Sequence, residues 1–166
     1  MPTIVCIVGA SGSGKTTFIE ALLPELKRRG HRVATMKHSH HRIDIDQPGK
    51  DSWRHRHAGA DAVVLCGPDA VALIRNVGQP ADPSQVMAWL GDDFDIVLAE
   101  GFTTSAYPKV RVGHNGKPEM DGSLVVAEVV GAAAEPGQLP RYAASDVGRV
   151  ADVIESLLPS LQRYSN

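Results

Sequence analysis

The residues with the clearest chemical role form a glycine-rich loop near the start of the chain. The loop follows an apolar run over residues 3–8, precedes a helical pattern, and matches GxxxxGKT in the order Gly9, Ala10, Ser11, Gly12, Ser13, Gly14, Lys15 and Thr16. In such a loop, backbone N–H groups converge on the β-phosphate, the lysine reaches the β- and γ-phosphate oxygens, and the hydroxyl ligates Mg²⁺. We therefore predict that the phosphates of a nucleoside triphosphate bind between Gly9 and Thr17, with Lys15 as a catalytic group and Thr16 as a magnesium ligand.

An acid and a glycine follow another apolar run later in the chain. Residues 96–99 are apolar, and Glu100 and Gly101 come directly after them, which is the form of a Walker B segment. Mg²⁺ takes oxygen ligands and keeps several waters, so Glu100 can bind it directly or through water while Thr16 supplies a second ligand. Gly101 would let the backbone approach the γ-phosphate. The plainer alternative is an acid that only forms a salt bridge at the end of a strand.

A long polar loop over residues 37–49 follows the second predicted strand. Lys37, at its start, could neutralise phosphate charge. Asp44 and Asp46 are two further catalytic candidates, because a loop in this place can order around the metal and the γ-phosphate and orient the attacking water. Each of the three residues could instead be an ordinary solvated side chain.

Histidines are frequent in and after this loop, which raises the question of a zinc or nickel site: His38, His40, His41, His55 and His57. Their spacing matches no familiar metal-ligand pattern, and neither cysteine is near them, so we expect no histidine-bound metal. The basic segment over residues 53–57 is short, and the chain has a formal net charge of -2. We therefore expect no nucleic-acid binding.

Apolar runs and helical patterns alternate along the chain, which predicts an α/β fold with a three-layer, mostly parallel sheet of the P-loop NTPase type. We expect one nucleotide-binding domain over residues 1–166 and a small antiparallel hairpin insertion. Strands are predicted over 3–8, 32–36, 62–65, 71–74, 96–99, 110–112 and 124–130, and helices over 16–30, 51–59, 83–90 and 145–158. We also expect a kink or break at Pro24, caps at Asp51 and Ser145, and a surface loop over residues 132–140.

The bulk composition favours a cytoplasmic protein that does not enter a membrane. No apolar stretch approaches the ~18 residues that a membrane-spanning helix needs, and the amino terminus lacks the basic region of a signal peptide. Cys6 and Cys66 both lie in apolar runs, where we expect them to be buried free thiols.

Several segments together resemble the MobB family of molybdopterin-guanine dinucleotide biosynthesis adaptor proteins. They are the phosphate loop, residues 37–41, 44–54 and 58–60, the run Ala99 to Phe102, and Tyr107-Pro108-Lys109. The resemblance implies a GTP-binding, Mg²⁺-dependent cytoplasmic protein that is weakly hydrolytic and dimeric. It would assist the molybdopterin guanylyltransferase that attaches GMP to molybdopterin.

Other functions remain open from the residues alone. A small-molecule kinase shares the phosphate loop and the size of the chain, and a metal-insertion GTPase would explain the histidines. No NKxD-like signature occurs in the chain, so a preference for guanine over adenine comes from the resemblance and not from a motif.

Overall fold

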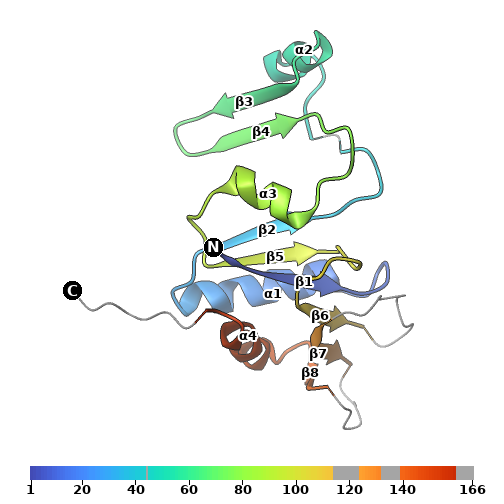
Figure 1. Cartoon of the computed structure of the whole chain (residues 1–166), viewed down its shortest axis with the longest axis vertical. Helices are drawn as coiled ribbons and strands as arrows, with labels where there is room; N and C mark the ends of the chain where they lie inside the picture. The colour runs from blue at the N-terminus through green and yellow to red at the C-terminus, as the bar shows by residue number, and fades with distance from the viewer. Residues whose placement is uncertain (44, 114–123, 132–138, 160–166) are drawn as a thin grey trace, which may run out of the picture. The chain divides into compact units, whose positions relative to one another are not determined.

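The computed structural model describes residues 1–43, 45–113, 124–131 and 139–159 (Figure 1). The chain forms two compact units. The sheet unit consists of Met1–His38 and Asp82–Asn166, and the hairpin unit consists of Ser39–Ala81. The expectation of a single nucleotide-binding domain over residues 1–166 stays a prediction.

The sheet unit is built on six parallel strands, which confirms the predicted parallel sheet. The strands are β1 (Thr3–Val8), β2 (Val33–Lys37), β5 (Ile96–Glu100), β6 (Lys109–Val112), β7 (Val125–Val130) and β8 (Arg141–Ala143), arranged in the order β2-β5-β1-β6-β7-β8. From β1 the chain crosses to β2 on one side, and from β5 it crosses to β6 on the other. In open parallel sheets, ligands bind at the carboxyl ends of strands next to such a reversal. Here those are the ends of β1 and β5.

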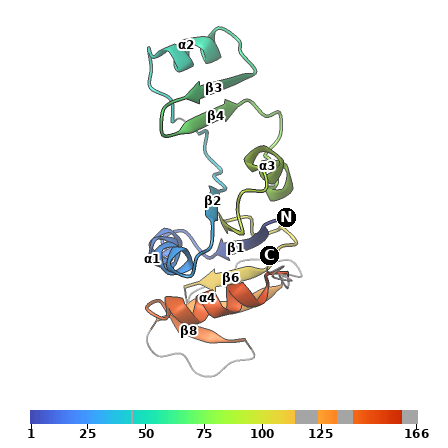
Figure 2. The same cartoon turned by 90° about the vertical axis from the view of Figure 1, so that its left-hand side faces the viewer.

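Helices cover both faces of this sheet and give the three predicted layers. Alternate residues of β1, such as Val5 and Ile7, pack with α1 (Lys15–Arg28) and α4 (Val147–Ser156). Cys6 and Val8 face the other way, into a second apolar cluster that Met87 and Leu90 of α3 (Pro83–Leu90) join. Figure 2 shows α1 and α3 on opposite sides of β2. β1 and β5 are therefore buried on both faces, as their continuous apolar sequences predict.

A kink or break was predicted at Pro24, but helix α1 runs through this residue without interruption, so a break there is wrong. A proline leaves the carbonyl four residues earlier without its helical N–H partner. Both Pro24 and Glu20 are exposed, so water can satisfy the carbonyl of Glu20 and the helix continues.

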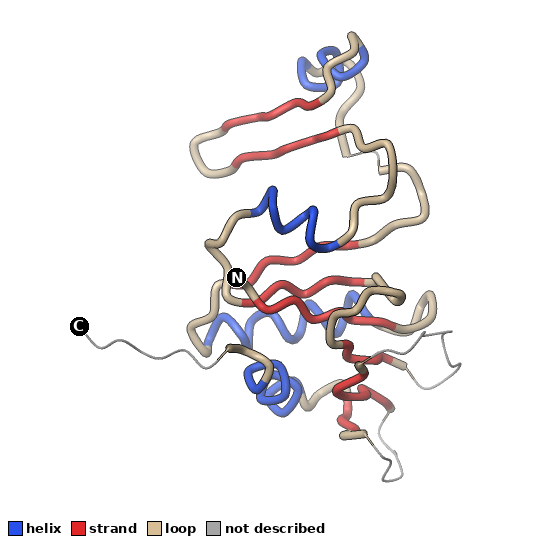
Figure 3. Tube along the Cα trace, in the orientation of Figure 1, coloured by secondary structure: helices blue, strands red, loops and turns tan. Residues whose placement is uncertain are grey.

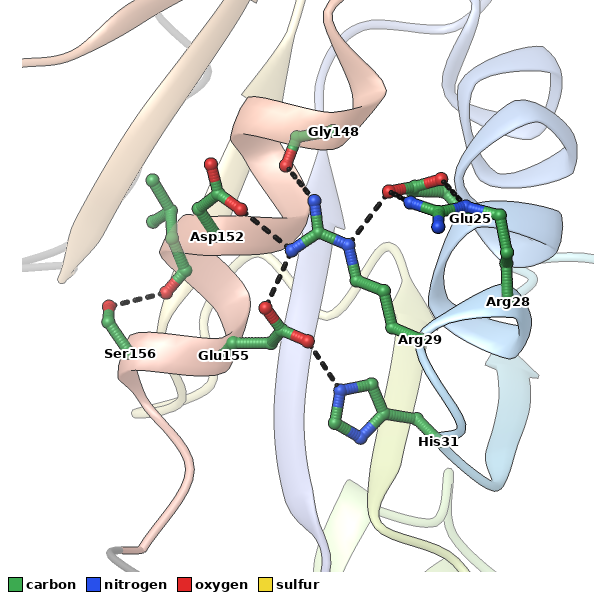
Figure 4. A network of polar contacts seen from close by, with 9 residues as sticks. Glu25, Arg28, Arg29, His31, Gly148, Asp152, Glu155 and Ser156 are labelled. Atoms are coloured by element: carbon green, nitrogen blue, oxygen red, sulfur yellow. Dashed lines mark hydrogen bonds and ion pairs between the residues drawn. The ribbon is translucent and has the colours of Figure 1, made fainter.

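An ionic network ties the carboxyl end of α1 to α4 (Figure 4). The Arg29 guanidinium donates to Glu25 at 2.8 Å, to Asp152 at 2.7 Å, to Glu155 at 2.6 Å and to the carbonyl oxygen of Gly148 at 2.8 Å. Hydrogen bonds from Arg28 and Arg29 lower the pKa of Glu25 to about 2. We call these contacts of Arg29 the α1–α4 clasp.

The hairpin unit contains α2 (Asp51–His57) and the strands β3 (Ala62–Cys66) and β4 (Val71–Arg75), drawn in red in Figure 3. β3 and β4 pair antiparallel, which confirms the predicted hairpin. The expectation that Cys66 is buried is wrong, because its side chain is exposed. Cys6, in contrast, is buried in β1, and burial raises the pKa of its thiol.

The remaining differences concern the N-caps of two helices and one strand that was not predicted. Lys50, not Asp51, is the N-cap of α2, and Asp146, not Ser145, is the N-cap of α4. Asp146 accepts a hydrogen bond from the backbone N–H of Ala143 at 3.2 Å, which closes the turn before the helix one residue later than predicted. β8 was not predicted, and most of the predicted surface loop, residues 132–138, lies outside the described residues. No helix in the described part of the chain is long and apolar enough to cross a membrane.

Candidate functional site

The phosphate loop connects the end of β1 to the start of α1. Gly14 is the N-cap of α1 and has a left-handed φ of 89°. No side chain among the described residues caps this end of the helix, and its first turn contains no acidic residue. The first N–H groups of a helix have no partner within the helix and attract anions. The start of α1 therefore presents donors where the sequence predicts phosphate.

Gly9 fixes the loop against the neighbouring strand β6. A Cβ atom at this position would lie 2.2 Å from the carbonyl oxygen of Val112 and 2.7 Å from the Ser13 Oγ. Only glycine can approach a backbone carbonyl so closely. The Ser13 hydroxyl is buried there and has no hydrogen-bond partner among the described residues. The first glycine of the motif is thus required by packing, before any ligand is considered.

Lys15 bends back over its own loop. Its Nζ donates to the carbonyl oxygens of Gly9 at 3.0 Å and Ala10 at 2.7 Å. Carbonyl oxygens are neutral acceptors, and an ammonium forms stronger hydrogen bonds with anionic oxygens. A phosphate placed in the loop would therefore compete well for the Lys15 ammonium.

Glu100 ends β5 beside the first turn of α1. The Thr16 hydroxyl lies 3.1 Å from Oε1 and 3.0 Å from Oε2 of Glu100, and the Lys37 Nζ lies 3.0 Å from Oε1. Register explains the pairing, because Lys37 and Glu100 are direct partners where β2 and β5 pair in parallel. We call Thr16, Lys37 and Glu100 the Glu100 cluster.

The Glu100 cluster has the donor set that suits magnesium. One hydroxyl and one carboxylate are hard oxygen donors, and Mg²⁺ needs few protein ligands because it keeps waters and binds substrate phosphates. Zinc and nickel prefer sets of histidine or cysteine. Among the described residues, no group of three or more His, Cys, Asp or Glu side chains is arranged to hold a metal ion.

A strained turn follows Glu100. Gly101 has a φ of 93°, and Phe102, although bulky, has a φ of 55°. A Cβ atom on Gly101 would lie 3.2 Å from the Cβ of His38, whose ring centroid is 5.2 Å from that of Phe102. Left-handed backbone at a bulky residue costs about 1–3 kcal/mol and persists only where surrounding structure enforces it. Position 101 therefore favours glycine for two reasons: its backbone is left-handed, and an added Cβ would crowd His38.

Lys109 holds the segment that follows this turn. Its side chain is completely buried at the start of β6, and its Nζ donates to the carbonyl oxygens of Ser105 and Tyr107. No motif in the sequence predicts a role for this lysine. The signal was a lysine at the start of an apolar strand, which is unusual because lysines are almost never fully buried without partners.

The comparisons with known proteins agree with this architecture. Residues 4–131 match the family described as MobB, molybdopterin guanine dinucleotide synthesis protein B. The chain belongs to the MobB family. A molybdopterin-guanine dinucleotide biosynthesis adapter protein of Haemophilus influenzae is 41% identical over 109 residues, which are 63% of this chain and 59% of that protein. The Escherichia coli adapter protein is 33% identical over 129 residues, covering 76% of this chain and 74% of that protein.

Solved MobB structures share the fold over nearly their whole length. The crystal structure of a molybdopterin-guanine biosynthesis protein B has a TM-score of 0.73 at 31% identity and covers 93% of this chain and 97% of its own. A crystal structure of Bacillus subtilis MobB has a TM-score of 0.73 at 28% identity, with coverage of 95% and 99%. The match to the Haemophilus influenzae sequence spans less than two thirds of that relative.

In this MobB-family chain, the predicted site residues fall into two groups. The sheet unit holds the residues of the loop, Lys37, Glu100 and Gly101, and it brings Thr16, Lys37 and Glu100 into contact. Asp46 belongs to the hairpin unit, where its Oδ1 accepts from the Ser52 hydroxyl at 2.8 Å and the Gln47 N–H at 3.1 Å. Asp44 lies outside the described residues. The structure thus gives Asp46 a role at the start of α2, and its catalytic role stays a prediction.

Proposed function

We propose that this MobB-family protein binds Mg²⁺ and GTP at the carboxyl edge of the sheet unit and assists a molybdopterin guanylyltransferase in the cytoplasm. The observation that carries the proposal is the Glu100 cluster: Thr16 comes directly after Lys15 in the phosphate loop, and its hydroxyl lies 3.0 Å from the carboxylate of Glu100 at the end of β5. The relatives are named adapter proteins of molybdopterin-guanine dinucleotide biosynthesis, which supports the partner. Molybdopterin itself is a second ligand to test.

Each residue of the edge has a distinct part in this proposal. Backbone N–H groups between Gly9 and Thr17 surround the β-phosphate, and Lys15 leaves its two carbonyl partners for phosphate oxygens. Thr16 and Glu100 would hold Mg²⁺, which supplies charge neutralisation at the β- and γ-phosphates. GTP hydrolysis is at most slow, because the sequence offers no arginine finger or water-orienting glutamine in a recognisable motif.

The protein is proposed to act as a homodimer, with the hairpin unit at the interface. Val64 pairs with Leu73, and Cys66 with Val71, so these side chains lie on one face of the hairpin. That face leaves Val64 56% and Val71 69% exposed. A two-stranded hairpin is only marginally stable alone, and a second copy would cover this apolar face. Light scattering of the wild type and of Val71→Lys would test this: a monomeric wild type would contradict the dimer.

The adapter role is tested by measuring guanylyltransferase activity on molybdopterin at limiting GTP. Adding this protein should raise the rate, and adding Lys15→Ala should not, because the variant cannot supply bound GTP. Lys27→Ala, an exposed lysine on the same helix, is the matched control and should act like the wild type. No effect of the wild-type protein at limiting GTP would count against the adapter role.

A further inference from the structure

Lys37 is the cation that balances Glu100 in this structure. The Glu100 side chain is only 12% exposed, while the Lys37 side chain is 61% exposed, and the Nζ to Oε1 distance is 3.0 Å. A poorly solvated carboxylate is costly unless a cation or hydrogen-bond donors compensate it. Because the Lys37 side chain is the more exposed of the two, its ammonium can move from Glu100 into solvent without crossing the protein interior.

The groups that would bind magnesium are engaged with each other. The Thr16 hydroxyl has both Glu100 oxygens within 3.1 Å, so its proton points towards the carboxylate. To serve as a metal ligand, Thr16 must turn this proton away, and a metal on Glu100 would lie beside the Lys37 ammonium, which contacts Oε1 of that carboxylate. A divalent cation and an ammonium on the same carboxylate would repel each other.

We propose that Lys37 occupies the metal's place on Glu100 and keeps the magnesium site closed until a triphosphate arrives. This inference rests on the proposed nucleotide site. With a triphosphate in the loop, the displaced ammonium gains anionic oxygens as new partners. Without a triphosphate, the ammonium of Lys37 exchanges the carboxylate for water when it is displaced. Lys37 therefore makes magnesium and nucleotide bind cooperatively and disfavours magnesium alone.

The proposal predicts effects of opposite sign when the charge of Lys37 is removed. In Lys37→Met, a divalent cation alone should bind more tightly, because its competitor is gone. The triphosphate alone should bind more weakly, because Glu100 then faces it without a counter-ion. A partly exposed ion pair contributes up to about 1 kcal/mol, so each affinity should change by about fivefold. Damage to the fold would instead weaken both.

The test uses Mn²⁺ as the metal probe, followed by electron paramagnetic resonance in nucleotide-free full-length protein. GTP binding in EDTA is measured in parallel by calorimetry. Lys37→Met should bind Mn²⁺ about fivefold more tightly and metal-free GTP about fivefold more weakly. Lys37→Arg keeps the charge and should restore both values, and Lys27→Met removes a distant charge and should change neither.

Two results would overturn the proposal. One is an unchanged or weaker Mn²⁺ affinity in Lys37→Met. The other is a gain in Mn²⁺ affinity that persists in Lys37→Met combined with Glu100→Gln, because the gain would then arise away from Glu100. Failure of the wild type to bind GTP would contradict the proposed function, while the Mn²⁺ comparison would still decide the role of Lys37.

Discussion

The two ends of helix α1 are built in opposite ways. At its carboxyl end, Arg29 makes hydrogen bonds to three carboxylates and one carbonyl, and its side chain is only 19% exposed. At its amino end, within the part of the chain that the structure describes, the helix has no capping side chain, and Lys15 contacts two neutral carbonyls. At the carboxyl end, the arginine is fully paired with carboxylates and a carbonyl. At the amino end, the lysine contacts carbonyl oxygens that an anion can replace.

This difference separates stability from function within one helix. The α1–α4 clasp joins segments far apart in sequence through charged hydrogen bonds, so it fixes α1 against α4. In the Glu100 cluster, by contrast, Thr16 and Lys37 contact Glu100, and these contacts must change if the proposed metal and nucleotide bind. Changes at the clasp should therefore alter stability and spare nucleotide binding, and loss of the ligand-binding side chain of Lys15 should do the reverse.

The largest effect is expected for Lys15→Ala. Hydrogen bonds between charged groups contribute about 1.5–3 kcal/mol each, and Lys15 is expected to form two with phosphate oxygens, so GTP affinity should fall by at least ~100-fold. The free energy of unfolding should hardly change, because the variant loses only contacts to the carbonyls of Gly9 and Ala10. Calorimetry with Mg²⁺ and GTP measures the first effect and urea denaturation the second. Unchanged affinity would refute the site.

Gly9→Ala should reduce both stability and nucleotide binding, because Gly9 fixes the phosphate loop against β6. The new Cβ would lie 2.2 Å from the Val112 carbonyl oxygen, which requires backbone movement and should cost at least about 2 kcal/mol of stability. GTP binding should be lost as well. Gly30→Ala is the control at the other end: its φ is 91° but no atom lies within 4 Å of the added Cβ. It should cost only about 1 kcal/mol and keep GTP binding, as thermal denaturation and calorimetry would report.

Arg29→Met should destabilise the sheet unit by about 2 kcal/mol, because it leaves Glu25, Asp152 and Glu155 without their shared cation. Urea denaturation would measure this loss. Arg28→Met is the matched control, since Arg28 also binds Glu25 but is 72% exposed, and its effect should be much smaller. Equal losses in the two variants, or weakened GTP binding in Arg29→Met, would contradict the division between the two ends.

The smallest effect is expected from acid. Hydrogen bonds from Arg28 and Arg29 lower the pKa of Glu25 to about 2, and bonds from His31 and Arg29 lower the pKa of Glu155. A lowered pKa means stabilisation that is complete above the ordinary carboxyl value of 4.5 and is lost as the pH falls towards 2. Urea denaturation over this range should show a steeper loss for the wild type than for Arg29→Met. Parallel curves would mean that the clasp does not respond to acid.

Local sequence was sufficient for elements whose signal is local. The phosphate loop, the apolar strands β1 and β5, and the β3–β4 hairpin each have a continuous pattern, and the structure has each of them. β8 was missed because Arg141-Tyr142-Ala143 has no apolar run, and its place comes from pairing with β7, where Arg141 lies opposite Glu128.

The site shows the same limit. The sequence predicted Thr16 and Glu100 from their motifs, but not that Lys37 would contact Glu100, because that contact depends on the register of β2 and β5. Nor did it predict the left-handed Phe102 or the buried Lys109, which depend on how the segment after Glu100 folds back. Asp44 and Asp46 share a polar loop with Lys37 in the sequence, yet the loop beyond His38 belongs to the hairpin unit.

The central claim is that the amino end of α1, with Glu100 beside it, binds a magnesium-bound guanine nucleotide. Isothermal titration of the wild-type protein with GTP and with ATP, each with and without Mg²⁺, tests it most directly. GTP should bind more tightly than ATP, and removal of Mg²⁺ should weaken GTP binding. ATP binding more tightly than GTP, or no nucleotide binding at all, would contradict it.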